Sequence, residues 1–153
     1  METTFRQIDF TNRDELFFIA KNDVGVPALF DRDFSTDVEA IDKMLKALEK
    51  FTPDDFCEVG VNTKNEIVAY HIIKRTPYFN RFAGSIYTLW VAPECRNQGI
   101  ATEIKRRGEI WAKENALDHI YTWVHADNTK MQNLNKDLGY QIVNYKMKKK
   151  IHP

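Results

Sequence analysis

Apolar residues recur along the chain with two different spacings. Val38, Ile41, Leu45 and Leu48 lie at i, i+3, i+7 and i+10, which is the stripe of a helix packed on one side. The segment Thr36-Asp37-Val38-Glu39 at its start has the spacing of a capping box. The pattern therefore predicts a helix that begins at this segment.

Shorter runs that are rich in β-branched and aromatic residues predict strands. Residues 56–61 and 67–73 are two such runs, and the polar residues 62–66 between them predict an antiparallel hairpin. A strongly apolar run follows at residues 85–91. The other expected elements are, in chain order, a strand at residues 5–10, a helix from Asn12 through about Asn22, a loop over Asp23–Phe34, a helix with Ile100, Ile104, Gly108 and Trp111 on one face, a strand at Ile120–Val124, a helix capped by Asn128 and ended by Gly139, and a final strand from Tyr140 to Ile151.

This order mixes a hairpin with a strand–helix–strand crossover. It predicts the α+β (mixed α/β) class, with a mixed sheet that carries helices on both faces. The chain has 153 residues and no Gly/Ser-rich or Pro-rich linker, so we expect a single domain over residues 1–153. The apolar fraction of 43% suffices to fill the core of such a domain without disulfides or metal.

Charge and composition exclude several classes of function. Twenty-two basic residues balance 22 acidic ones, which argues against binding to nucleic acid. No apolar run approaches the roughly 20 residues of a membrane span, and the N-terminus does not resemble a signal peptide. The two cysteines and four histidines lack metal-ligand spacing. We therefore expect a cytoplasmic protein without a metal; the composition leaves a homodimer open.

The segment from Thr88 to Thr102 carries the strongest chemical signal, because an apolar strand runs through a polar loop directly into a helix. At its centre stands Arg96-x-x-Gly99-x-Ala101. The first backbone amides of a helix lack partners and carry partial positive charge, so a loop with small residues at this point can hold a phosphate group. A tight turn alone explains the spacing equally well.

The surroundings of this loop add specificity. The segment resembles motif A of the GNAT superfamily of acyl-CoA-dependent N-acetyltransferases, R/Q-x-x-G-x-G/A, and the order of elements agrees over nearly the whole chain. Val91-x-Pro93 precedes the motif at the usual distance, and the last expected helix and strand also match. Two sequence motifs resemble those of the acetyltransferases related to mycothiol synthase: Thr88-x-x-Val91 and Thr122-x5-Asn128-x-x-Met131-x3-Asn135-x-x-Leu138-Gly139-Tyr140.

The resemblance implies a central mixed sheet of about six to seven strands with about four helices. It also implies transfer of an acetyl group from acetyl-CoA to an amine by direct attack in a ternary complex, and we expect this amine to belong to a small molecule. Pantetheine would add to the strand near Trp90 and Val91, and the backbone N–H of Val91 would hold the oxyanion. The residues implied to bind the cofactor are Trp90, Val91, Arg96, Asn97, Gln98, Gly99, Ile100, Ala101, Thr102, Asn128 and Asn135.

One position departs from the family pattern. Many members carry a tyrosine seven residues after the capping asparagine, where its hydroxyl protonates the departing thiolate; here that residue is Asn135. An amide is no acid, although it can hydrogen-bond to the sulfur or hold a water. Asn135 is thus a catalytic candidate by positioning. The alternative is a coenzyme-A-binding sensor or interaction protein with little or no activity.

No residue stands out as the general base. His125 is expected at the end of the fifth strand, and an imidazole suits proton transfer near neutral pH. A capping or structural role explains His125 better than catalysis does. Lys105, Arg106 and Arg107 could reach the 3′-phosphate of coenzyme A, yet an exposed helix face usually carries such charges.

Overall fold

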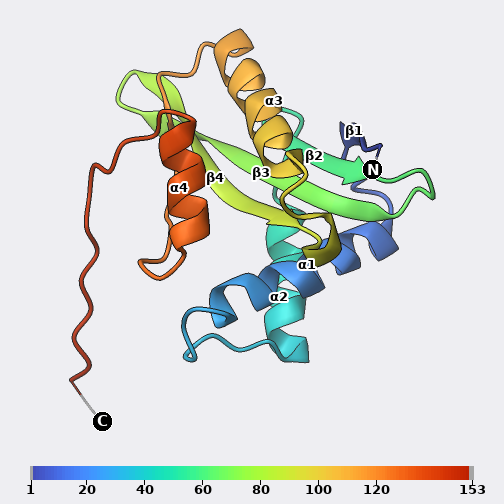
Figure 1. Cartoon of the computed structure of the whole chain (residues 1–153), viewed down its shortest axis with the longest axis horizontal. Helices are drawn as coiled ribbons and strands as arrows, with labels where there is room; N and C mark the ends of the chain where they lie inside the picture. Colours follow the sequence, from blue (N-terminus) through green and yellow to red (C-terminus); the bar gives the residue numbers. More distant parts are fainter. Residues whose placement is uncertain (1, 152–153) are drawn as a thin grey trace. The chain divides into compact units, whose positions relative to one another are not determined.

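The computed structural model describes residues 2–151. The chain divides into two compact units, Met1–Trp123 and Val124–Pro153. The described part of the first unit holds a five-stranded sheet with three α-helices, and that of the second holds one α-helix (Figure 1).

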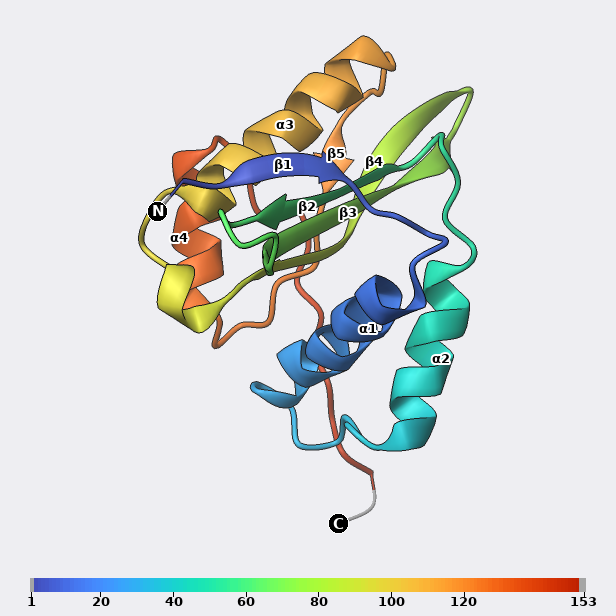
Figure 2. The same ribbon diagram turned by 90° about the vertical axis from the view of Figure 1, so that its right-hand side faces the viewer.

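The sheet of the first unit is mixed. Its strands lie in the order β1-β2-β3-β4-β5, and neighbours are antiparallel except for β4 and β5, which are parallel. Helices α1 and α2 cover one face and α3 covers the other (Figure 2). The predicted α+β class is confirmed. The elements are β1 (Thr4–Gln7), α1 (Arg13–Ala28), α2 (Val38–Leu48), β2 (Phe56–Val61), β3 (Ile67–Tyr78), β4 (Arg81–Val91), the 3-10 turn η1 (Pro93–Cys95), α3 (Ile100–Glu114) and β5 (Ile120–Tyr121).

The number of strands is lower than the six to seven expected. Within the described residues, 140–151 form no strand, and β5 ends at Tyr121 although its apolar run continues to Val124. A strand needs a hydrogen-bonded neighbour, which alternating side chains alone do not supply. The side chains of Val143 and Tyr145 are accordingly exposed.

Helix α1 continues past Asn22 through the first half of the segment Asp23–Phe34, which was expected to be a loop. Its buried stripe of Leu16, Ile19 and Ala20 is prolonged by Asp23 and Val24, so packing holds one and a half further turns in place. The start of α1 is as predicted, since the Asn12 side chain accepts hydrogen bonds from the backbone amides of residues 14 and 15.

The start of α2 differs in detail from the predicted capping box. Asp37, and not Thr36, occupies the N-cap, and its carboxylate accepts from the amide of Ala40 at 2.8 Å. Glu39 instead pairs with Lys43 one turn later on the surface.

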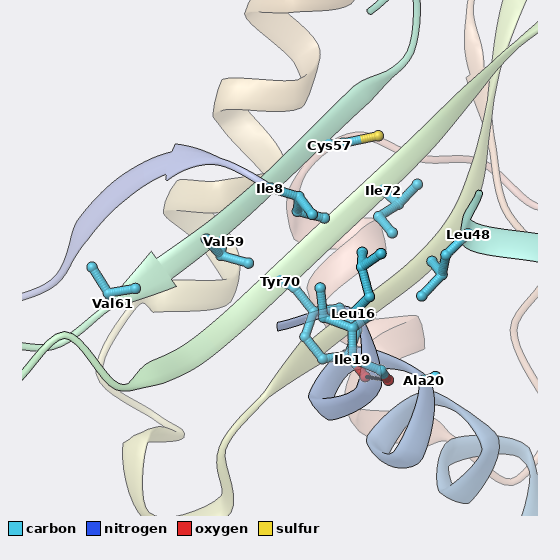
Figure 3. Packing of buried hydrophobic residues seen from close by; sticks show 10 residues of the cluster. All are labelled: Ile8, Leu16, Ile19, Ala20, Leu48, Cys57, Val59, Val61, Tyr70 and Ile72. Carbon is cyan, nitrogen blue, oxygen red and sulfur yellow. Dashed lines mark hydrogen bonds between the residues drawn. The ribbon is translucent and has the colours of Figure 1, made fainter. Parts of the chain in front are cut away.

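Two apolar clusters hold the helices to the sheet. On the face of α1 and α2, Leu16, Ile19 and Leu48 pack against the Tyr70 and Ile72 side chains of β3 (Figure 3). Full burial of each such aliphatic side chain contributes about 1.5–3 kcal/mol. The cluster on the α3 face consists of Val68, Ala69, Val91, Ala92, Cys95, Ile100 and Ile104.

The second unit contains α4 (Thr129–Asp137). The side chain of Asn128 caps the helix by accepting from the amide of Met131 at 3.2 Å. Gly139 follows the helix with a φ of +86°, the left-handed conformation that glycine adopts without strain. Both ends of this helix are as predicted.

Candidate functional site

Strand β4 has one edge that is only partly occupied. It pairs with β3 from Arg81 to Val91, but with β5 only at Gly84 and Ser85. Beyond Ser85 no strand among the described residues pairs with that edge. The backbone groups along the second half of β4 can therefore receive an extended molecule as an additional strand.

A β-bulge marks the start of this free edge. Ile72 of β3 pairs with Thr88 and Ile73 pairs with Ile86, so Tyr87 is an extra residue on β4. The bulged residue lies two positions after Ser85, the last residue of β4 that pairs with β5.

The backbone direction at the end of β4 can be followed from one hydrogen bond. The amide of Ala92 donates to the Val68 carbonyl of β3 at 2.9 Å. Successive residues of a strand direct their backbone groups to opposite sides, so the N–H and C=O of Val91 face the free edge. In agreement, the Val91 carbonyl accepts from Nε of Arg96, which belongs to the following loop, at 3.0 Å.

The loop between β4 and α3 is held by its own side chains. Besides Arg96, Gln98 ties the loop, because its Nε2 donates to the Glu94 carbonyl at 3.1 Å. Arg96 thus has a structural role in addition to the cofactor-binding role that the family resemblance implies. Asn97, with φ of +60°, and Gly99, with φ of +80°, turn the chain into the helix.

The N-terminus of α3 is open. Gly99 is the N-cap residue and supplies no side chain, so the amides of Ile100, Ala101 and Thr102 have no acceptor within the part of the chain that the structure describes. A Cβ placed on Gly99 would meet no atom within 4 Å. These amides and the positive end of the 15-residue helix α3 together suit an anion.

Packing fixes the direction of this helix. Ile100 and Ile104 are buried against Val91, Ala92 and Cys95, which lie at the end of β4 and in η1. The open amides are therefore held close to the free edge of β4 by the core of the first unit.

The basic residues of α3 are less available than the sequence suggests. Lys105 is buried, with 2% of its surface exposed, and burial lowers its pKa to about 8. Arg107 forms a two-fold ion pair with Glu58 of β2, at 2.5 and 2.8 Å. The expectation of an exposed basic face is wrong for Lys105, and Arg107 is held by its ion pair. Arg106 is exposed.

Trp90 shapes the α1 side of the free edge. Its indole stacks on the Tyr70 ring at 5.2 Å between centroids and meets Phe18 of α1 edge-on at 5.7 Å. Next to it the hydroxyl of Thr88 donates to Oδ1 of Asp23, a buried residue of α1. Sequence reasoning missed Asp23, although its place on the stripe of Leu16, Ile19 and Ala20 was a signal for an acid on a buried face.

The second unit holds the remaining candidates. Because the strand ends earlier than expected, His125 lies four residues beyond β5, in the turn that leads into α4. Its carbonyl accepts from the amide of Asn128 at 2.9 Å, and its Nδ1 accepts from the amide of Asp127 at 3.2 Å. Asn135 lies in the last turns of α4, and its carbonyl accepts from the amides of Leu138 and Tyr140.

Comparison with known proteins identifies the family. The model of the acetyltransferase (GNAT) family matches residues 26–140, three quarters of the chain, including β4, the loop and α3. The chain belongs to the GNAT acetyltransferase family. No curated protein matches the sequence.

Solved GNAT-like structures share this fold over their whole length. A candidate acetyl transferase from Pyrococcus furiosus is 23% identical, with a TM-score of 0.77 over 98% of this chain and 100% of that one. An aminoglycoside 6′-N-acetyltransferase from Acinetobacter baumannii is 17% identical, with a TM-score of 0.68 over 99% of each chain. AAC(6′)-Iy in complex with the bisubstrate analogue CoA-S-monomethyl-acetylneamine is 12% identical, with a TM-score of 0.69 over 100% of each chain.

Two structural findings complete the description of this GNAT protein. Among residues 2–151, no group of three or more His, Cys, Asp or Glu side chains is arranged to hold a metal ion. Over the same residues, every helix is too short or too polar to cross a membrane.

Proposed function

We propose that the protein transfers an acetyl group from acetyl-CoA to the amine of a small molecule, by direct attack in a ternary complex. The observation that carries the proposal is the free edge of β4, which leads into the open N-terminus of α3. The first feature suits the amide-rich pantetheine arm, and the second suits the pyrophosphate.

Each part of the cofactor has a proposed set of residues. The pyrophosphate lies on the backbone of the loop formed by Arg96, Asn97, Gln98, Gly99, Ile100 and Ala101, with the Thr102 hydroxyl beside it. Pantetheine runs along Trp90 and Val91. The Val91 amide, which faces the free edge, holds the oxyanion that forms when the amine attacks, a role worth about 3 kcal/mol. Asn128 and Asn135 are assigned to the cofactor by the family resemblance.

A charge placed at Gly99 tests the anion site. Gly99→Glu puts a carboxylate in front of the open amides, so we expect the dissociation constant for coenzyme A, measured by calorimetry, to rise at least about 100-fold. Gly139→Glu is the matched control, because Gly139 has nearly the same φ and equal open space. Unchanged affinity in Gly99→Glu places the cofactor elsewhere.

The resemblance to the acetyltransferases related to mycothiol synthase supports membership of that subgroup. It assigns no acceptor. One structural neighbour is an aminoglycoside 6′-N-acetyltransferase, and AAC(6′)-Iy binds a bisubstrate analogue that joins coenzyme A to acetylneamine. Both findings support a small acceptor here as well.

A second candidate function, a coenzyme-A-binding sensor, is favoured by one observation: Asn135 stands where many members have a tyrosine acid. Turnover of acetyl-CoA with a panel of amines separates the two functions. If Asn135 positions the sulfur or a water, Asn135→Ala lowers kcat by about tenfold, the scale of one lost hydrogen bond, and leaves coenzyme A affinity nearly constant. Equal kcat in the wild type and Asn135→Ala removes this residue from the mechanism.

A further inference from the structure

Among the described residues of the first unit three carboxylates are buried, and two of them, Glu15 and Asp55, have a basic partner and several hydrogen bonds. Glu15 pairs through both oxygens with Arg6, at 3.0 and 2.7 Å, and also accepts from the backbone amide of residue 9. Asp55 pairs with Lys74 at 2.9 Å and accepts from the amides of residues 52 and 75. Each satisfies the rule that a buried charge is paired.

Asp23 breaks this rule. It is 8% exposed, yet the only hydrogen bond of its side chain within residues 2–151 comes from the Thr88 hydroxyl, and no Lys, Arg or His pairs with it. The second carboxylate oxygen, Oδ2, accepts no hydrogen bond from the described residues, and it is not completely enclosed by protein atoms. Burial raises the pKa of Asp23 to about 6. A hydrophobic residue at this position of the buried α1 stripe would stabilise the fold more, so packing alone does not account for the Asp23 carboxylate.

Within residues 2–151, no basic side chain pairs with the Asp23 carboxylate. The phenols of Tyr70 on β3 and Tyr87 on β4 face it, and their pKa values are raised by burial and by the Asp23 charge. On α2 the charged side chains pair with one another at the surface. The other charged residues of α1 are Arg13, Asp14 and Lys21, which are exposed, and Glu15, which pairs with Arg6.

The bulge in β4 connects Asp23 to the free edge. Strict alternation would direct Tyr87 and Thr88 to opposite faces of the sheet. Both instead face the layer of α1 and α2, since Thr88 contacts Asp23 and the Tyr87 hydroxyl lies 3.3 Å from Sδ of Met44. The carboxylate is thereby held against the strand segment whose other edge is open.

The geometry points to a further role: we infer that Asp23 receives the cationic amine of the acceptor and takes its proton, with the Thr88 hydroxyl as the positioning group. The acceptor class is then a primary alkylamine that binds as its ammonium ion. This inference rests on the proposed acetyl transfer.

The proton and electron balance is complete. The ammonium gives one proton to the Asp23 carboxylate, and the neutral nitrogen attacks the carbonyl carbon of the thioester. The tetrahedral intermediate collapses by breaking the C–S bond; of the two protons that the attacking nitrogen still carries, one is lost and ends on the thiolate, and the other remains as the amide N–H. Asp23 then releases its proton to solvent, so that acetyl-CoA and an alkylammonium give an N-alkylacetamide, coenzyme A and one proton.

Asp23→Asn tests the role with little change in shape. With acetyl-CoA and either propylamine or spermidine as probes, we expect kcat/KM at pH 7.5 to fall about 100-fold or more, with coenzyme A affinity unchanged. The midpoint of thermal unfolding should not fall, because the variant removes a buried unpaired charge. Thr88→Val should lower kcat/KM and Thr88→Ser should restore it.

The pH profile gives a readout that a purely structural role would not change. In the wild type, kcat/KM should rise with pH through the ionisation of Asp23 near pH 6, because only the carboxylate can take the proton. This inflection should be absent in Asp23→Asn. Its loss in His125→Gln with retention in Asp23→Asn overturns the proposal.

A measurement without turnover separates this inference from the proposed function. In carbon-detected NMR, propylammonium chloride should lower the pKa of the Asp23 carboxyl relative to sodium chloride at equal ionic strength, because a bound cation favours the carboxylate. An identical pKa in both salts overturns the inference even if acetyl transfer is found. A lowered pKa without any acetyl transfer refutes the proposed function and leaves the cation site in place.

Discussion

The two halves of β4 differ in what their edges meet. Residues 81–85 lie between β3 and the residues around β5, and Gly84 is enclosed there by Ile73 and Ile120. Within the part of the chain that the structure describes, residues 86–91 pair with β3 alone, and they lead into a loop where Gly99 faces open space. At Gly84 the missing side chain allows close packing, whereas at Gly99, in the loop after β4, it leaves space for a ligand. The same strand thus serves as scaffold at one end and as binding surface at the other.

Of the tests that compare the two halves of β4, the largest effect should come from removing the free-edge amide at Val91. Val91→Pro deletes an N–H that faces away from β3, so the ladder with β3 should survive. Because this amide is the proposed oxyanion donor, we expect kcat to fall about 100-fold. Val91→Ala shortens the same side chain and keeps the amide. If both variants have equal steady-state kcat, the oxyanion is held by another group.

A change in residues 81–85 should alter the free energy of unfolding and not the affinity for coenzyme A. Gly84→Val would place its Cβ 2.9 Å from Cγ2 of Ile73 and 3.2 Å from Cγ1 of Ile120. Overpacking of this kind costs about 1–3 kcal/mol of unfolding free energy, which urea denaturation measures. Calorimetry should give the wild-type affinity for coenzyme A. Weakened coenzyme A binding in a stably folded variant would contradict the division of β4 into two halves.

How far the sequence predicts the molecule depends on whether a feature is local. The cap at Asn128, the hairpin of β2 and β3, and the β4–loop–α3 order follow from neighbouring residues and were predicted. The early end of β5 reflects its pairing with β4, which stops at Ser85, and periodicity along the chain does not reveal where such pairing stops. Asp23 was missed for the same reason, since its burial depends on a helix that runs past its expected end.

The candidate site divides in the same way. The open amides after Gly99 belong to one continuous segment, so their arrangement could be expected from the motif. The burial of Lys105 could not be predicted from the motif, because this residue lies near His71 of β3, which is distant in the sequence. Likewise, the pairing of Arg107 joins α3 to Glu58, 49 residues earlier in the chain. Charges on a helix can be counted from the sequence, whereas their partners across the fold cannot.

The smallest expected effect concerns the edge of residues 86–91 that pairs with β3. There, Nδ1 of His71 donates to the Thr88 carbonyl at 2.8 Å, and the imidazole is buried against Phe56 and α3. Burial lowers the pKa of His71 to about 3, so the native state binds its proton less readily than the unfolded chain does. Stability from this group is therefore present above about pH 6.5 and is lost as the pH falls toward 3, by up to about 1.4 kcal/mol per pH unit.

Urea unfolding at pH 7.5, 6.5 and 5.5 measures this slope. His71→Asn keeps a donor for the Thr88 carbonyl but has no titrating group, so its stability should decline less between pH 6.5 and 5.5 than that of the wild type, whatever its stability at pH 7.5. Coenzyme A affinity should not follow this difference, because His71 lies behind β4, on the edge that β3 occupies. If the free energy of unfolding changes equally with pH in the two proteins, His71 takes up its proton in the folded state, and water reaches its imidazole.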